Sequence, residues 1–150
     1  MPTSPDFVEF VLDLLAPVGP VQARAMFGGH GLYARGAMVG LLDDDELFLK
    51  TDESCRATFV AAGCRQWSFV SKTQRMENTS YFRPPDEAHE DAEAMYPWAR
   101  LALDAALRAR AERARRAAAK AKRPARARGT TSDRRAARPR KPESRRPRAR

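Results

Sequence analysis

The sequence predicts an α+β fold: a helix, three strands, a second helix, two strands and a third helix, arranged as a two-layer domain with an antiparallel sheet. Three observations predict it. Short apolar runs between residues 21 and 50 are separated by Gly- and Asp-rich turns, which is typical of antiparallel strands. An amphipathic segment precedes these runs. A second amphipathic segment, at residues 92–107, follows them and can cover the same face of the sheet.

The first helix is predicted to begin at Ser4-Pro5-Asp6, which combines a capping hydroxyl, proline at the first helical position and an acid in the first turn. Apolar residues then recur close to i, i+4 and i+7 through residue 15. Pro17 and Gly19 end the helix and turn the chain.

The three strands before the second helix are expected at residues 21–27, 37–42 and 47–50. Gly28, Gly29 and Gly31 lie after the first of them. These glycines indicate a bend or bulge that needs positive φ or close backbone approach. The alternative is an anion-binding loop, which the spacing does not favour because no helix begins after it.

The remaining elements of the domain are predicted from the same kinds of cap, turn and strand signals. Thr51-Asp52 is expected to cap a second helix that ends at Gly63 in a left-handed conformation. Strands are expected at residues 65–70 and 79–83, with a polar loop at 71–78. A third helix follows acidic residues 86–91, and Pro97 is tolerable only because it lies near the first turns. Strong helix formers continue to Lys122, so this helix can run on past the core.

Charge divides the chain into two parts. Residues 1–107 carry 9 Lys/Arg and 16 Asp/Glu, whereas residues 108–150 carry 19 Lys/Arg and 3 Asp/Glu. After Leu107 there is no aromatic residue and no Val, Ile, Leu or Met. We therefore expect a folded domain at residues 1–108 and a basic tail at 109–150 that is largely disordered or partly helical.

Several separated motifs resemble the N-terminal domain of the TfoX/Sxy family. They include Arg-Ala-Met-Phe-Gly-Gly at 24–29, Gly-Leu-Tyr at 31–33, Leu-Phe-Leu-Lys at 47–50 and Ser-Tyr-Phe-Arg at 80–83. The resemblance spans about residues 5–108. The matching positions are Arg24, Met26, Phe27, Gly28, Gly29, Gly31, Tyr33, Gly40, Lys50, Gly63, Tyr81, Arg83 and Trp98. The resemblance implies the same two-layer α+β fold and a non-enzymatic regulator of competence-gene expression in bacteria that acts with a protein partner in transcription.

The tail predicts binding to DNA. Its dense, mostly arginine charge attracts any polyanion, and guanidinium groups make bidentate phosphate contacts. It has no aromatic residue for base stacking, so we expect binding without sequence preference. The predicted nucleic-acid-binding residues are Arg115, Arg116, Lys120, Lys122, Arg123, Arg126, Arg128, Arg134, Arg135, Arg138, Arg140, Lys141, Arg145 and Arg146.

No pattern in the sequence predicts catalysis, a cofactor or a metal site. His30 and His89 are far apart, and Cys55 and Cys64 lack metal-ligand or disulfide-framework spacing. No membrane-spanning or secretory segment is expected, and the protein is predicted to be cytoplasmic, free or nucleoid-associated, with reduced thiols. Apolar residues on both faces of the strands predict a homodimer. Two alternatives stay open: a nucleoid-associated DNA binder, or a small-molecule-binding or catalytic domain that uses Gly28–Gly31 and His30.

Overall fold

The computed structural model describes residues 3–26, 28–70 and 75–122. Its order is α1 (Pro5–Leu15), η1 (Ala16–Val18), β1 (Val21–Met26), β2 (Gly29–Ala34), β3 (Ala37–Asp43), β4 (Glu46–Lys50), α2 (Arg56–Ala61), β5 (Gln66–Val70), β6 (Arg75–Phe82), η2 (Asp86–His89) and α3 (Ala92–Lys122). All pairs in the sheet are antiparallel, in the order β1-β2-β3-β4-β6-β5. The predicted α+β class is confirmed.

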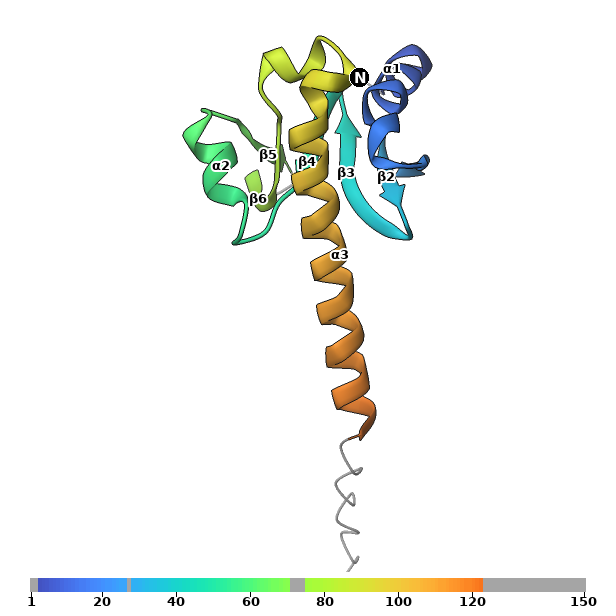
Figure 1. Ribbon diagram of the computed structural model, residues 1–150, viewed down its shortest axis with the longest axis vertical. Coiled ribbons are helices and arrows are strands. Elements are labelled where there is room, and N and C mark those ends of the chain that lie inside the picture. Colours follow the sequence, from blue (N-terminus) through green and yellow to red (C-terminus); the bar gives the residue numbers. More distant parts are fainter. Residues whose placement is uncertain (1–2, 27, 71–74, 123–150) are drawn as a thin grey trace, which may run out of the picture.

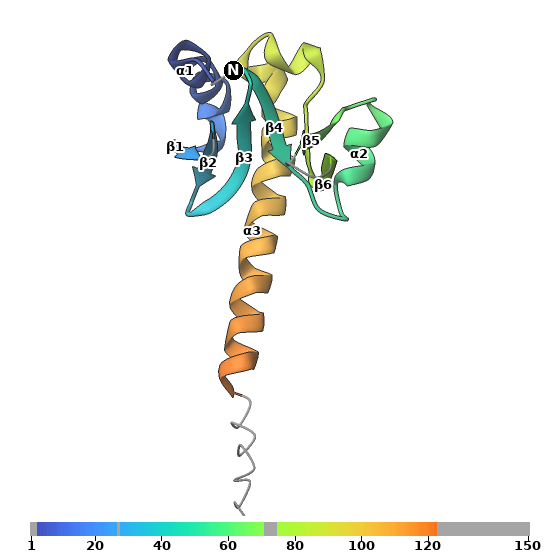
Figure 2. The same ribbon diagram turned by 180° about the vertical axis from the view of Figure 1, so that it is seen from behind.

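Two helices cover one face of the sheet. α1 and the first half of α3 lie side by side over the strands, and the view from behind shows the other face of the sheet open (Figures 1 and 2). The apolar stripes of the helices meet the inward side chains of the sheet because both need to leave water. This core includes Val11, Leu14, Leu15, Leu32, Leu42, Leu47, Leu49, Met95, Ala99, Ala102 and Leu103.

The predicted start of α1 is confirmed. The Ser4 Oγ accepts a hydrogen bond from the Phe7 N–H at 3.3 Å, and Pro5 occupies the first helical position. The two tight hairpins are confirmed as well. Arg35 and Gly36 join β2 to β3 with φ of 50° and 74°, and Asp44 and Asp45 join β3 to β4 with φ of 50° and 57°. Positive φ at both turn residues matches the twist of the flanking strands.

The first sheet segment contains four strands, one more than expected. Residues 29–34, where the glycines indicated a bend or bulge and no strand was expected, form strand β2, which pairs with β1 and β3 along its length. Glycine lowers local strand preference, so the sequence signal is weak there. Hydrogen-bonded pairing with β1 and β3 stabilises this strand despite its low intrinsic strand preference.

Two other boundaries differ from the expected ones. α2 begins at Arg56 and not at Thr51-Asp52; residues 53–55 form a turn that leads into the helix, with the Asp52 carbonyl accepting hydrogen bonds from the Cys55 and Arg56 N–H groups. β6 begins at Arg75, within the expected loop; residues 71–74 lie outside the described part of the chain. The left-handed C-cap is confirmed, since Gly63 has φ of 73°.

α3 is a single helix of 31 residues that includes Pro97. Asp91 caps it, accepting a hydrogen bond from the Ala94 N–H at 2.8 Å. The last buried residue of α3 is Ala106, yet the helix continues to Lys122 and leaves the body as a rod (Figure 1). The expected continuation past the core is confirmed, and the helix runs unbroken across the expected domain boundary at residue 108.

Candidate nucleic-acid interface

The projecting part of α3, residues 108–122, is the most strongly charged surface in the described chain. It carries seven Lys/Arg and one acid, Glu112. From Ala111 onward every residue of it is exposed. At 1.5 Å per residue, this part of the helix is about 22 Å long. It therefore presents about two positive charges per turn along four turns. Most of the residues between the charged ones are alanines, whose small side chains leave the helix backbone accessible.

Four of the predicted nucleic-acid-binding residues lie on this projecting segment: Arg115, Arg116, Lys120 and Lys122. The Arg116 guanidinium pairs with the Glu112 carboxylate at 2.7 Å. The other predicted residues lie outside the described residues: Arg123, Arg126, Arg128, Arg134, Arg135, Arg138, Arg140, Lys141, Arg145 and Arg146.

Sequence reasoning missed Arg108, Arg110 and Arg113, which the helix adds to the same segment. The signal was available, because helical spacing places Arg113, Arg116 and Lys120 on one side. Arg110 and Arg113 lie within the predicted basic tail and belong with the other binding residues on this ground as well.

Two arginines fix the base of the projecting segment to the body. Arg108 donates to both carboxylate oxygens of Asp52, at 2.6 and 3.1 Å. The Arg110 guanidinium donates to the backbone carbonyl of Arg35, in the β2–β3 turn. The hydrogen bond from Arg108 holds the pKa of Asp52 below its ordinary value. The same bond raises the pKa of Arg108. The direction of the rod relative to the sheet is therefore set by contacts on two separate loops.

Five of the family-motif residues make contacts with one another in the sheet, as two pairs of a cation over an aromatic ring and a glycine beside one of the rings. The Arg24 guanidinium lies over the Tyr33 ring at 4.7 Å, and the Lys50 ammonium lies over the Tyr81 ring at 5.1 Å. Lys50 and Tyr81 are also direct partners in the β4–β6 pairing. Gly31 makes room for Tyr33, because a Cβ there would lie 3.0 Å from the ring. Residues up to 57 positions apart in the sequence thus form one cation-aromatic row.

Other family-motif residues have structural roles. Gly29 and Gly40 allow close strand approach, since a Cβ would lie 2.0 Å from the Leu42 carbonyl oxygen and 2.6 Å from that of Phe48, respectively. Gly28 has φ of 78°, and Met26 ends β1 opposite Gly29. Trp98 packs edge-on against Phe59 at 5.0 Å. Phe27 lies outside the described residues.

The glycine-rich segment gives no support to an anion-binding loop. Gly29 and His30 pair with Met26 and Ala25 of β1, and His30 also pairs with Leu42 of β3. The backbone here is engaged in the sheet and forms the bend that the sequence indicated. The Nδ1 of His30 is buried without a hydrogen-bond partner among the described residues.

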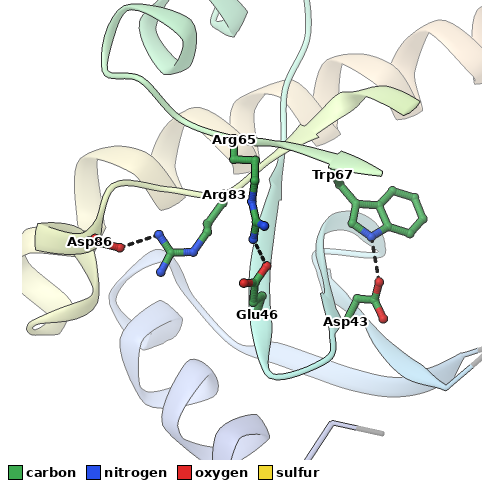
Figure 3. Close-up of polar contacts among 6 residues, drawn as sticks. All are labelled: Asp43, Glu46, Arg65, Trp67, Arg83 and Asp86. Carbon is green, nitrogen blue, oxygen red and sulfur yellow. Dashed lines mark hydrogen bonds and ion pairs between the residues drawn. The ribbon is translucent and has the colours of Figure 1, made fainter. Parts of the chain in front are cut away.

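A polar cluster ties β5 to the β3–β4 turn (Figure 3). The Trp67 indole N–H donates to Asp43 at 3.1 Å, and Arg65 pairs with Glu46. Part of the acidic turn that follows β3 is therefore occupied by intramolecular partners. Nearby, Arg83 of the family motif pairs with Asp86 at 2.5 Å, and this hydrogen bond lowers the pKa of Asp86.

The described residues contain no group of three or more His, Cys, Asp or Glu placed to hold a metal ion. Cys55 and Cys64 are free, and burial raises the pKa of both thiols, which keeps them protonated at neutral pH. Across residues 3–26, 28–70 and 75–122, no helix combines the length and apolar character needed to cross a membrane.

Comparison with known proteins decides the family. The model of the TfoX N-terminal domain matches residues 13–106. The chain belongs to the TfoX N-terminal domain family. The resemblance predicted from the motifs is thereby confirmed. A curated relative, the DNA transformation protein TfoX1 of Aliivibrio fischeri, is 31% identical over 74 residues. That match covers 49% of this chain and 35% of the relative, so the two proteins share about a third of the relative's length.

The TfoX N-terminal domain match ends where the core ends. Its last residue, 106, is also the last buried residue of α3. The basic projecting segment therefore begins just beyond the family domain, on the same unbroken helix.

Proposed function

We propose that this protein is a non-enzymatic, competence-related regulator that binds duplex DNA without sequence preference through the projecting segment of α3 and the basic residues after it. Membership of the TfoX N-terminal domain family supports the regulatory part, and the name of the relative from Aliivibrio fischeri refers to DNA transformation. The body then serves to meet a protein partner in transcription, and a homodimer is a further part of this proposal.

The observation that carries the DNA-binding part is the exposed cationic helix. Seven positive side chains along about 22 Å can neutralise several phosphates and release their counterions. An α-helix also fits the width of the major groove. The segment has no Asn, Gln or aromatic side chain to read or stack on bases. Arginine can also read guanine in the major groove, so binding without sequence preference requires that these arginines contact mainly phosphates.

A charge-removal variant tests this proposal directly. Arg115, Arg116, Lys120 and Lys122 are replaced together by Gln, which keeps helix propensity high. Binding to two unrelated 30-base-pair duplexes is followed by fluorescence anisotropy across salt. The wild type should bind both duplexes equally. If all four residues contact phosphate, the variant's salt slope should be smaller in magnitude by about 3 to 4, at roughly 0.9 per phosphate.

Glu112→Gln is the matched control. It removes the acid that pairs with Arg116 at 2.7 Å, so it should strengthen binding while preserving the helix. Unequal affinity for the two duplexes, or an unchanged salt slope in the four-site variant, would contradict the proposal. The regulatory part is tested separately, by measuring competence-gene transcripts after the gene is deleted in its host; unchanged transcripts would contradict that part.

A further inference from the structure

A cavity lies between the sheet and the base of the projecting segment of α3. Its volume is about 420 Å³. Tyr33, Lys50 and Tyr81 line it from the sheet, and Arg113 and Arg116 line it from α3. The sheet residues are the same family-motif residues that form the cation-aromatic row. A cavity of this size accommodates a small ligand.

The cavity has an excess of positive charge. Lys50, Arg113 and Arg116 line it with one acid, Glu112, which is already paired with Arg116 at 2.7 Å. Among the described residues, Arg113 makes no hydrogen bond or ion pair. Burial and then the charge of Arg113 lower the pKa of Lys50, while Asp52 opposes this effect. Asp52 is in turn held by Arg108. Positive groups that repel one another in the free protein are typical of a binding site for an anion.

The tyrosines of the cavity are held in place before any ligand arrives. Tyr81 is fixed by Lys50 on its face and by Trp67, whose ring meets it edge-on at 6.1 Å. Arg24 holds Tyr33 in the same way. Tyr81 and Arg113 line the same cavity, one from the sheet and one from α3. A phenol can donate a hydrogen bond to an anion beside a guanidinium.

We propose that this cavity binds a phosphate group, with Lys50 and Arg113 as its principal cationic partners and Tyr81 as a hydrogen-bond donor. Phosphate suits the site because it can accept hydrogen bonds from several cations at once, which a single carboxylate does less well. The phosphate belongs either to a free nucleotide or to the backbone of DNA that lies along the projecting segment. With a free nucleotide as its ligand the cavity goes beyond the proposed function; with DNA as its ligand the inference rests on that function and adds a phosphate contact to it.

The experiment uses the full chain and three single variants: Lys50→Gln, Arg113→Gln and the control Lys120→Gln. Each removes one positive charge, but Lys120 lies on the same helix away from the cavity. Arg113→Gln changes an exposed helix position, so it keeps the test valid if Lys50→Gln is destabilising. Binding of AMP and of inorganic phosphate is measured by isothermal titration calorimetry, and binding of a 30-base-pair duplex by anisotropy.

Two results support the proposal and identify the source of the phosphate. AMP binding that weakens about tenfold in Lys50→Gln and Arg113→Gln, but less than twofold in Lys120→Gln, assigns the cavity to a free nucleotide. Absence of AMP and phosphate binding, with duplex affinity falling at least fivefold more in Lys50→Gln and Arg113→Gln than in Lys120→Gln, assigns it to the DNA backbone.

The proposal is overturned if neither small ligand binds and the three variants lose equal duplex affinity. It is also overturned if AMP binds equally well to all four proteins. In both cases DNA binding by the projecting segment can remain intact, so failure of this inference is distinguishable from failure of the proposed function.

Discussion

Single glycine residues determine how closely the strands approach one another, and Gly29 is the clearest example. Its backbone approaches β3 so closely that a Cβ would lie 2.0 Å from the Leu42 carbonyl oxygen. Gly28 beside it has φ of 78° but open space around it. Gly29→Ala should therefore cost about 3 kcal/mol or more in unfolding free energy, through forced movement of β3. Gly28→Ala should cost about 1–2 kcal/mol, from backbone strain alone.

Urea unfolding of the two alanine variants measures this difference. Equal destabilisation would contradict the prediction that the close approach of Gly29 to β3 makes a Cβ more costly there than at Gly28. The sequence indicated that these glycines need positive φ or close backbone approach. The structure shows that Gly28 has positive φ and that Gly29 lies close to β3.

The ion pair between Asp52 and Arg108 predicts a pH dependence. The lowered pKa of Asp52 means that the pair stabilises the fold above the ordinary carboxyl pKa of 3.8, and that this stability is lost as pH falls through the lower folded-state pKa. Asp52→Asn should cost about 0.5 kcal/mol at pH 6, a small value because Arg108 is half exposed. The cost should shrink toward zero near pH 2.

Chemical unfolding at the two pH values checks this prediction. Arg108→Gln is the control, and it should reproduce the loss at pH 6 without adding to it in the double variant. A cost that is the same at both pH values would contradict the assignment of the stabilisation to the charged pair.

At the scale of elements, α3 contains one avoidable defect. Pro97 is exposed at the sixth position of the helix, where it cannot donate the hydrogen bond that another residue would make to the Glu93 carbonyl. Pro97→Ala should raise the free energy of unfolding by about 1–3 kcal/mol. Thermal unfolding measures this, with the exposed substitution Arg100→Ala as a control expected to change stability little; a lower melting temperature for Pro97→Ala would show that the ring packs usefully.

Elements with strong local signals were predicted well, and elements fixed by distant partners were not. The Ser4 cap, the turns between the apolar runs of residues 21–50 and the Gly63 C-cap were all readable from the sequence. The strand at Gly29–Ala34 was not, because its stability comes from pairing on both sides. The expected cap residue of α2, Asp52, lies before a turn at residues 53–55 and pairs with Arg108, 56 residues away in the sequence.

The candidate site, like the fold, was predicted only where local sequence signals determine it. Composition predicted a basic tail, and the helix-forming residues after Leu107 predicted its first turns. That Lys50, Tyr81 and Arg113 meet at one cavity depends on the sheet register and on where α3 leaves the body. Neither is visible in local sequence.

At the scale of the whole molecule, charge is separated along α3. The acidic residues of η2 and of the β3–β4 turn lie near the end of the body where α3 begins, and the projecting segment leaves from the opposite end (Figure 1). The acidic residues of the body therefore lie far from the cations of the projecting segment. These cations can contact a polyanion with little repulsion between the polyanion and the body. Salt should weaken such binding strongly, because exposed charges are screened within about 8–10 Å.

The most direct test of the account is a duplex-DNA titration across salt, comparing the whole chain with residues 1–108. The shorter chain keeps every buried residue of α3, the last of which is Ala106. If the whole chain neutralises roughly eight phosphates, the logarithm of its binding constant should fall with the logarithm of salt concentration at a slope near −7. Residues 1–108 should not bind measurably. Equal binding by the shorter chain, or binding by the whole chain that is insensitive to salt, would contradict the account.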